Sequence, residues 1–319
     1  MAVGGSLARS YTFALPNGTA GVGSLTVTVT ADTYNYQYEY NTNGDAETNN
    51  SASTTATSTL AAYPDLLIQN VTITPDLNSG DLVTISWQDA NQGDGVAAGS
   101  FYDYVRVRNT TTGEWLYSSA PYHNAADGSI GVGGALNRSV SFTLPNGTRG
   151  VGNLEVTISS DWYNQVFEYN ISGTSETNNT FSTTVVSTIG DYPDLRVQNL
   201  SLSQPSIQSG DTVTLNWEVL NSGNAASGSF YDRVVVLNQT TGETLVNTAV
   251  YYNQATGGAI PGGELRARSF SFTLPQGTRG AGDLRMTVTT DVYNGVFEYN
   301  TGGDAETNKL AACGLRFGA

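Results

Sequence analysis

The stretch Thr212-Val-Thr-Leu-Asn-Trp-Glu-Val219 alternates strictly between polar and apolar residues. In an extended chain its four apolar side chains lie on one face, and the polar side chains lie on the other. A period of two is typical of a half-buried strand. The same alternation recurs in 264–274 and 283–291, and no segment shows a sustained period of 3.6 residues. The sequence therefore predicts a protein built from strands.

Turn signals such as Asn-Ser-Gly-Asp and Thr-Thr-Gly-Glu separate the alternating segments. In the last part of the chain the predicted strands are 195–202, 212–220, 229–238, 243–250, 264–274 and 283–291, and a seventh is expected at a place that corresponds to 180–189. Seven antiparallel strands in roughly 110–130 residues predict an all-β fold of immunoglobulin-like antiparallel β-sandwiches. The apolar phase breaks between Ile68 and Val71, which predicts a β-bulge in the first strand.

The sequence repeats itself. Leu-Pro-Asn-Gly-Thr begins at Leu15 and Leu144, and Leu-Pro-Gln-Gly-Thr begins at Leu274. Tyr-Pro-Asp-Leu begins at Tyr63 and Tyr192, 129 residues apart. A period of this length is that of a domain, so we expect a tandem array.

Three copies follow from these landmarks. The first copy, 1–62, is the C-terminal half of a domain and supplies strands E, F and G. The second copy, 63–191, is complete. The third copy, 192–308, is expected to lack its native last strand, because 309–319 matches nothing at the equivalent place in the second copy. We interpret this ending as a truncated array with a cloning-derived tail.

Several motifs resemble the CARDB family, the cell-adhesion-related domains found in bacteria and archaea. They are Pro193-Asp-Leu195, Trp217-Glu-Val-Leu-Asn-Ser-Gly223 and Gly228-Ser-Phe-Tyr-Asp232. The resemblance covers 64–180 and 193–308, and half a domain at 4–60. It implies immunoglobulin-like modules of large secreted or surface proteins, with a role in adhesion or spacing. The second copy departs from the pattern at Asp89, and the loop before Glu306 is longer than the resemblance implies.

Composition narrows the function classes. The net charge of -15 disfavours nucleic acid and anionic lipid, which require clusters of Lys and Arg. The single cysteine, Cys313, excludes an intrachain disulfide. The sequence has no apolar run long enough to cross a bilayer and no signal peptide. Abundant Gly, Thr, Ser, Asn and Tyr favour an extracellular, surface-exposed module without membrane insertion.

An acidic segment occurs in all three copies, after the sixth strand. It runs Asp161-Trp-Tyr-Asn-Gln-Val-Phe-Glu168 and on to Asn179, and it has counterparts that begin at Asp32 and Asp291. By period two, Asp103 and Asp232 point to the core side of the third strand, where a carboxylate is costly unless it is paired. In the predicted sandwich the third strand begins beside the end of the sixth.

This convergence of oxygen donors predicts a Ca²⁺ site at one pole of each complete copy. The candidate ligands are Asp103, Asp161, Asn164, Glu168, Glu176 and Asn178 in the second copy, and Asp232, Asp291, Asn294, Glu298, Glu306 and Asn308 in the third.

Three alternatives stay open. Asp103 could instead pair with an arginine or cap backbone amides. Glu168 could be an exposed strand residue whose neighbours pack. The Asp-x-Tyr-Asn segment could be only a turn.

Other residues carry weaker signals. His123 is the only histidine and has no histidine or cysteine partner in the sequence pattern, so a zinc or catalytic role is not expected. Exposed-looking tyrosines could stack on sugars or could shield the poles; they are Tyr34, Tyr36, Tyr38, Tyr40, Tyr163 and Tyr169. No nucleophile–base pair is evident, so we do not expect an enzyme.

The leading hypothesis is a non-enzymatic adhesin, stalk or surface-fibre segment that Ca²⁺ stabilises. The alternative is a carbohydrate-binding module of a secreted hydrolase. Expected partners are other copies of the chain or neighbouring repeats, and surface glycans or proteins. Open sheet edges predict strand complementation or a filament, in which the strand near 51–60 of one chain completes the last sheet of another. In the alternative version, 310–317 fills that edge within the same chain.

Overall fold

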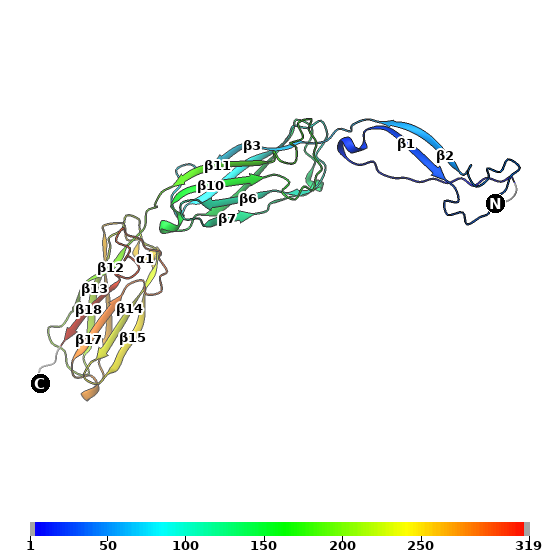
Figure 1. The fold of residues 1–319 in the computed structure, drawn as a ribbon. Helices are drawn as coiled ribbons and strands as arrows, with labels where there is room; N and C mark the ends of the chain where they lie inside the picture. The colour runs from blue at the N-terminus through cyan, green and yellow to red at the C-terminus, as the bar shows by residue number, and fades with distance from the viewer. Residues whose placement is uncertain (1–3, 316–319) are drawn as a thin grey trace. The chain divides into compact units, whose positions relative to one another are not determined.

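The computed structural model describes residues 4–315 and shows a chain of antiparallel strands joined by loops (Figure 1). The chain divides into two compact units. One unit comprises 4–77, 82–143 and 152–186, and the other comprises 78–81, 144–151 and 187–315. Within the described part of the chain, no helix is long and apolar enough to cross a membrane.

The third copy is a sandwich of two antiparallel sheets. One sheet has the order β12-β13-β16 and the other has the order β15-β14-β17-β18. The strands are β12 (Leu195–Leu202), β13 (Thr212–Asn221), β14 (Phe230–Asn238), β15 (Glu243–Tyr252), β16 (Leu265–Thr273), β17 (Leu284–Thr289) and β18 (Leu310–Leu315). The six predicted strands of this copy are therefore confirmed within one to two residues at each end. The third strand pairs with the sixth, because β14 lies against β17 as expected.

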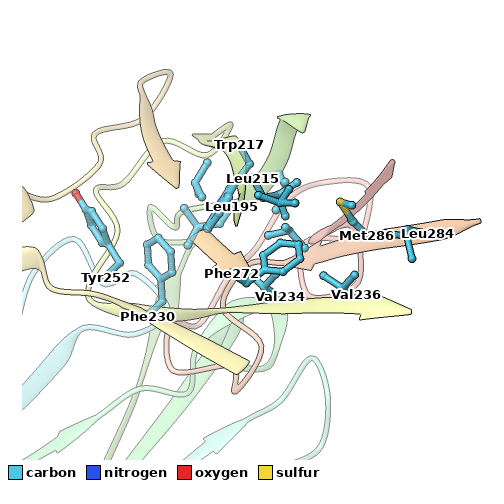
Figure 2. Packing of buried hydrophobic residues seen from close by; sticks show 14 of the residues in the cluster. Leu195, Leu215, Trp217, Phe230, Val234, Val236, Tyr252, Phe272, Leu284 and Met286 are labelled. Atoms are coloured by element: carbon cyan, nitrogen blue, oxygen red, sulfur yellow. The ribbon is translucent and has the colours of Figure 1, made fainter. Parts of the chain in front are cut away.

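The core of this copy lies between the two sheets (Figure 2). Trp217 of β13, Val234 of β14 and Met286 of β17 belong to one buried cluster, and each is 1% exposed or less. The apolar face of 212–219, from which the strand prediction began, is the face that this cluster buries. Burying a side chain of this size stabilises the fold by about 1.5–3 kcal/mol relative to leaving it in water.

The second copy has the same strand order, with the sheets β3-β4-β9 and β11-β10-β6-β7. Its strands are β3 (Leu66–Ile73), β4 (Leu82–Asn91), β5 (Phe101–Tyr102), β6 (Tyr104–Asn109), β7 (Trp115–Ser119), β8 (Tyr122–His123), β9 (Ala135–Thr143), β10 (Gly152–Ser159) and β11 (Thr180–Ser187). The strand that β14 forms without a break is here divided at Asp103. Pro121 stands opposite the division, and a proline has no N–H to donate to the ladder.

Helical turns are short and lie in the connections. They are η1 (Gly18–Gly21), η2 (Ala125–Asp127), η3 (Gly147–Gly150), α1 (Gln254–Gly257) and η4 (Gly277–Arg279).

The bulge in the first strand is confirmed. The register of β3 against β4 shifts between Gln69 and Thr72, and Asn70 has φ 52°. The first strand of the third copy does the same, since β12 shifts between Gln198 and Ser201 and Asn199 has φ 51°. Each bulge moves the apolar phase by one residue, which is the phase break visible in the sequence.

The first copy differs from expectation in one strand. β1 (Gly23–Thr30) and β2 (Ser51–Ser58) pair as the sixth and seventh strands should. Residues 5–16, which were expected to form strand E, have no regular structure. In the second copy the corresponding strand β9 pairs with β4. Residues 4–62 include no counterpart of β4, so strand E has no ladder to join.

The last sheet of the third copy is closed within the chain. β18 pairs with β17 from Leu284↔Leu315 to Thr289↔Leu310. Of the two versions considered for this edge, the structure shows the one in which the tail fills it in cis. The expectation reached to residue 317, and its last two residues lie outside the described part of the chain.

Candidate metal centre

The acidic loop of the third copy lies between β17 and β18, and its first residue holds the backbone of the loop. The two carboxylate oxygens of Asp291 accept hydrogen bonds from the N–H groups of Gly295 and Val296 at 2.9 and 3.2 Å. Asp291 and Asn294 have φ 39° and 49°, a left-handed conformation that Asp and Asn adopt more readily than most residues. The Asp-x-Tyr-Asn segment is therefore a tight turn that also fixes one carboxylate in place.

The other two copies build the same turn. Asp161 has φ 43° and accepts from the backbone N–H groups of Gln165 and Val166, both at 2.8 Å. Asp32 has φ 42° and accepts from Tyr36 and Gln37 at 2.9 and 2.8 Å. The first copy forms this turn without a strand E, so the segment folds on local hydrogen bonds.

A pair of glutamates forms the second part of the loop. The backbone N–H of Glu168 donates to Glu176 Oε1 at 2.8 Å, and its side-chain Oε2 accepts from the N–H of Leu66. Glu168 is 2% exposed. The alternative that Glu168 is an exposed strand residue is therefore wrong, because its carboxylate lies inside the fold. Burial, together with the charges of Glu176 and Asp161, raises the pKa of Glu168 to about 8, although the hydrogen bonds from Leu66 and Asn179 oppose the shift.

In the third copy a lysine ammonium lies among the carboxylates. Carboxylate oxygens of Asp291, Glu298 and Glu306 lie within 4.8 Å of one another, close enough to hold a metal ion. Lys309 Nζ lies 3.2 Å from Asp291 Oδ2, 2.9 Å from Glu298 Oε1 and 2.5 Å from Glu306 Oε2. The Lys309 side chain is 4% exposed. The ammonium therefore occupies the centre of the acidic cluster.

The ammonium and the carboxylates of this cluster each stabilise the charged form of the other. Burial by itself would lower the pKa of Lys309, but hydrogen bonds to Glu306 and Glu298 and the charges around it raise that pKa. Burial raises the pKa of Glu298 to about 7, and Lys309 opposes the shift. Glu168, which forms no ion pair with a lysine in the described part of the chain, has a pKa of about 8.

Sequence reasoning missed Lys309, because it assigned this residue to the unmatched tail. The second copy has Asn179 at the same distance after its last loop glutamate. Asn179 Nδ2 donates to Glu168 Oε1 at 2.8 Å. Its Oδ1 has no hydrogen-bond partner among residues 4–315, although the residue is only 5% exposed. A signal was present in the sequence: the third loop ends in Asn-Lys where the others end in Asn-Asn.

Asn178 and Asn308 each bind an aspartate at the start of the first strand through Nδ2. Asn308 Nδ2 donates to Asp194 Oδ1 at 3.0 Å, and Asn178 Nδ2 donates to Asp65 Oδ1 at 3.0 Å. The aspartate in each case belongs to the repeated Tyr-Pro-Asp-Leu motif. These contacts hold the end of the loop to the start of the first strand, which explains why both motifs repeat together.

Asp103 and Asp232 are paired with arginines. Arg138 Nε lies 2.8 Å from Asp103 Oδ2, and Arg268 Nε lies 2.9 Å from Asp232 Oδ2. Both aspartates are 0% exposed. Burial raises the pKa of each carboxyl, and the arginine opposes the shift. Arginine pairing was one of the alternatives for Asp103, and the structure shows it.

The start of the third strand nevertheless lies beside the acidic loop, as expected. The N–H of Trp162, next to Asp161, donates to the carbonyl of Tyr102 at 2.8 Å. In the third copy the N–H of Val292 donates to Tyr231 at 2.9 Å. The start of the third strand thus lies beside the end of the sixth in both complete copies.

His123 is buried beside Phe101, with ring centroids 4.9 Å apart, and is 5% exposed. It packs in the core instead of lining a site. Tyr163 is 61% exposed, and Tyr34, Tyr36, Tyr38 and Tyr40 are 77–87% exposed. Tyr169 packs against Tyr63 at 6.0 Å between centroids.

Comparison with known proteins identifies a CARDB domain at residues 192–309, which is the third copy together with Lys309. No curated protein matches the chain.

Among solved structures, the crystal structure of a CARDB domain from Pyrococcus furiosus in complex with di-metal ions is 18% identical. The match covers 41% of this chain and 100% of that one, with a TM-score of 0.29. A solution structure of the same domain gives the same values. Red sea bream transglutaminase is 9% identical over 80% of this chain and 31% of its own, with a TM-score of 0.27.

Proposed function

We propose that the chain is a non-enzymatic extracellular segment of an adhesin, stalk or surface fibre, and that Ca²⁺ stabilises the acidic loop of its second copy. One observation carries the metal part. Asp161 and Glu168 are buried and Glu176 is half-buried, and no ion pair within residues 4–315 includes any of the three. Buried carboxylates without a counter-charge are costly, and a bound cation removes that cost.

The donor set suits a hard cation. Ca²⁺ takes six to eight oxygen ligands, and carboxylates and amide carbonyls are typical. The ligands we propose are Asp161, Asn164, Glu168, Glu176 and Asn179. Asp103 is left out because its Oδ2 accepts from Arg138, and Asn178 is left out because its Nδ2 donates to Asp65. Ca²⁺ among these oxygens would favour the ionised form of Glu168 and lower its pKa.

Thermal unfolding of the full chain tests this proposal. A ligand that binds only the folded state stabilises it by RT ln(1 + [L]/Kd). The melting temperature of the second copy should fall in EDTA and rise with the logarithm of added CaCl₂. Magnesium is the control, because its demand for near-ideal octahedral geometry suits this loop poorly. Identical melting curves in EDTA and CaCl₂ would contradict the proposal that Ca²⁺ stabilises the second copy.

The adhesion part rests on the CARDB domain, whose family is related to cell adhesion, and on the acidic, glycine- and threonine-rich composition. Its test is binding of the purified chain to cell surfaces or matrix proteins. Binding that is lost when the chain is first digested with a protease would support it, and the absence of binding to any surface would contradict it.

A carbohydrate-binding function is the second candidate, because both complete copies carry a partly exposed tyrosine trio. Tyr102 contacts Tyr122 and Tyr163, with centroids 4.7 and 5.9 Å apart. Tyr231, Tyr251 and Tyr293 repeat this arrangement. Exposed aromatic rings are suited to stacking on sugars. Glycan-array binding that is lost in Tyr163→Ala would favour this function over the first.

Self-association by strand exchange remains a proposal. Exchange at the last sheet would have to displace β18, which already pairs with β17 along its length. Exchange of β2 would have to break its pairing with β1. Light scattering at high concentration tests the proposal: a concentration-dependent rise in mass supports it, and a constant monomer mass contradicts it.

A further inference from the structure

The acidic loops of the second and third copies differ in charge at two equivalent positions: Thr174 corresponds to Asp304, and Asn179 corresponds to Lys309. Asp161, Glu168 and Glu176 correspond to Asp291, Glu298 and Glu306, each 130 residues later. Their hydrogen bonds also correspond, from the turn aspartate to the glutamate that accepts from the first strand. At the same offset of 130 residues, Asn179 of the second copy corresponds to Lys309 of the third.

Lys309 binds the cluster as a cation would. Its Nζ contacts one oxygen from each carboxylate and also Asn294 Oδ1, at 3.0 Å. The four oxygens belong to the residues that correspond to Asp161, Asn164, Glu168 and Glu176. An ammonium has three N–H donors, so all of them are engaged inside the cluster.

The second copy has the corresponding carboxylate and amide residues without the ammonium. Asn179 is buried and directed into the cluster, because its Nδ2 donates to Glu168 Oε1. Its Oδ1 has no partner among residues 4–315, and neither has Glu176 Oε2. Buried polar atoms of this kind are expected to have partners, so they indicate a missing one. A cation between these oxygens would satisfy both.

We propose that Lys309 is a tethered substitute for the divalent cation. The third copy is then stabilised without metal and does not bind Ca²⁺ in its acidic cluster, whereas the second copy binds one Ca²⁺ at the equivalent place. This proposal rests on the function proposed above, because it assigns the calcium to one copy. A covalently attached ammonium is present at every calcium concentration, so the two copies respond differently to the surroundings.

A reciprocal exchange in the full chain tests the proposal. Asn179→Lys should remove one Ca²⁺ per chain, and Lys309→Asn should add one, as counted by calorimetric titration of the chelated protein with CaCl₂. Hydrogen exchange of peptides from 152–187 and 284–315 assigns each change to a copy. In Asn179→Lys, the exchange of 152–187 should no longer respond to Ca²⁺. In Lys309→Asn, the exchange of 284–315 should begin to respond.

Lys309→Met serves as the matched control, because it removes the ammonium and adds no oxygen. It should weaken protection in 284–315 without creating a Ca²⁺ response as large as that of Lys309→Asn. If Lys309→Asn is unfolded in EDTA, refolding of 284–315 on addition of CaCl₂ supports the proposal, and failure to refold contradicts it. The test with Asn179→Lys is independent of whether Lys309→Asn folds in EDTA.

Failure of this inference is distinguishable from failure of the proposed function. Calcium that binds the wild-type chain with a stoichiometry unchanged by either exchange would overturn the inference and leave the calcium function standing. A wild-type chain that binds no calcium, together with no gain in Lys309→Asn, would overturn both.

Discussion

Lys309 Nζ lies 2.9 Å from Glu298 Oε1, whereas the corresponding Glu168 of the second copy receives only an amide hydrogen bond, from Asn179. The two glutamates have the same backbone contact, since Oε2 of each accepts from the N–H of a leucine at the start of the first strand. At this glutamate the two copies therefore differ in the group that faces its Oε1, which is an ammonium in the third copy and a neutral amide in the second.

Replacing this glutamate with glutamine should have opposite effects in the two copies. Glu298→Gln removes a carboxylate from Lys309 and should destabilise the third copy by about 1–3 kcal/mol. Glu168→Gln removes a buried carboxyl that forms no ion pair within residues 4–315, and it should stabilise the second copy in EDTA by a similar amount. Native-state hydrogen exchange of 284–315 and 152–187 measures both effects. Changes of the same sign would contradict the charge argument.

Asp89→Val should stabilise the second copy by about 1–3 kcal/mol at pH 8. Asp89 is buried beside Asp103, and both share Arg138, at 3.5 and 2.8 Å. The third copy has Val219 at this place, and its tryptophan donates to Asp232 instead. Trp87, which now donates to Asp89, would have Asp103 as a comparable acceptor. Urea unfolding of the variant and the wild type measures the difference, and a less stable variant would count against this reading.

The pH dependence follows from the same residue. Burial, together with the charge of Asp103, raises the pKa of Asp89 from 3.8 to about 8, although Arg138 opposes the shift. Between about pH 4 and pH 8 the folded state therefore holds a proton that the unfolded state has released, so this group makes stability fall as the pH rises. In EDTA, the stability of Asp89→Val should fall less steeply across this window than that of the wild type. Parallel pH profiles would contradict the assignment.

At position 70, a substitution by glycine should cost less stability than a substitution by alanine. Its φ of 52° at the bulge of β3 is left-handed, and alanine enters that region at a cost of roughly 1–2 kcal/mol. Asn70→Ala should lower stability by about 1 kcal/mol, and Asn70→Gly should lower it less, although both lose the bond to Gln88. Asn199 of the third copy offers the same comparison. Equal losses in both variants would show that the side-chain hydrogen bond, and not the backbone, decides.

Arg268→Met should destabilise the third copy by about 3–5 kcal/mol, because it leaves Asp232 buried without a counter-charge. The double variant Arg268→Met with Asp232→Leu should recover much of this loss. Chemical unfolding followed by exchange of 284–315 measures both. A double variant as unstable as the single one would mean that the packing of Arg268 against Trp217 matters more than the charge.

The sequence was sufficient to predict the strands, because the alternation at Val213 and Leu215 reports directly on which face is buried. The bulge was also visible, since one extra residue shifts the apolar phase. Strand E of the first copy was predicted from the match of 1–62 to the second copy and does not form. Alternation reports only the tendency of a segment, and a strand also needs a partner in the ladder.

The site was harder to predict. The acidic loop could be found from its repetition, and Asp161 and Glu168 lie together as expected. The inward direction of Asp103 was also correct, but period two cannot reveal that Arg138 arrives from a different strand of the other sheet. Lys309 was missed because one basic residue beyond a repeat boundary has no pattern of its own. Only the fold brings it back among the carboxylates.

Anomalous diffraction from crystals grown with a lanthanide in place of calcium tests the central claim most directly. The account predicts one strong peak about 2.5 Å from the carboxylate oxygens of Asp161, Glu168 and Glu176, and none among Asp291, Glu298 and Glu306, where Lys309 lies. Empty density at the second copy, or a peak beside Lys309, would contradict it.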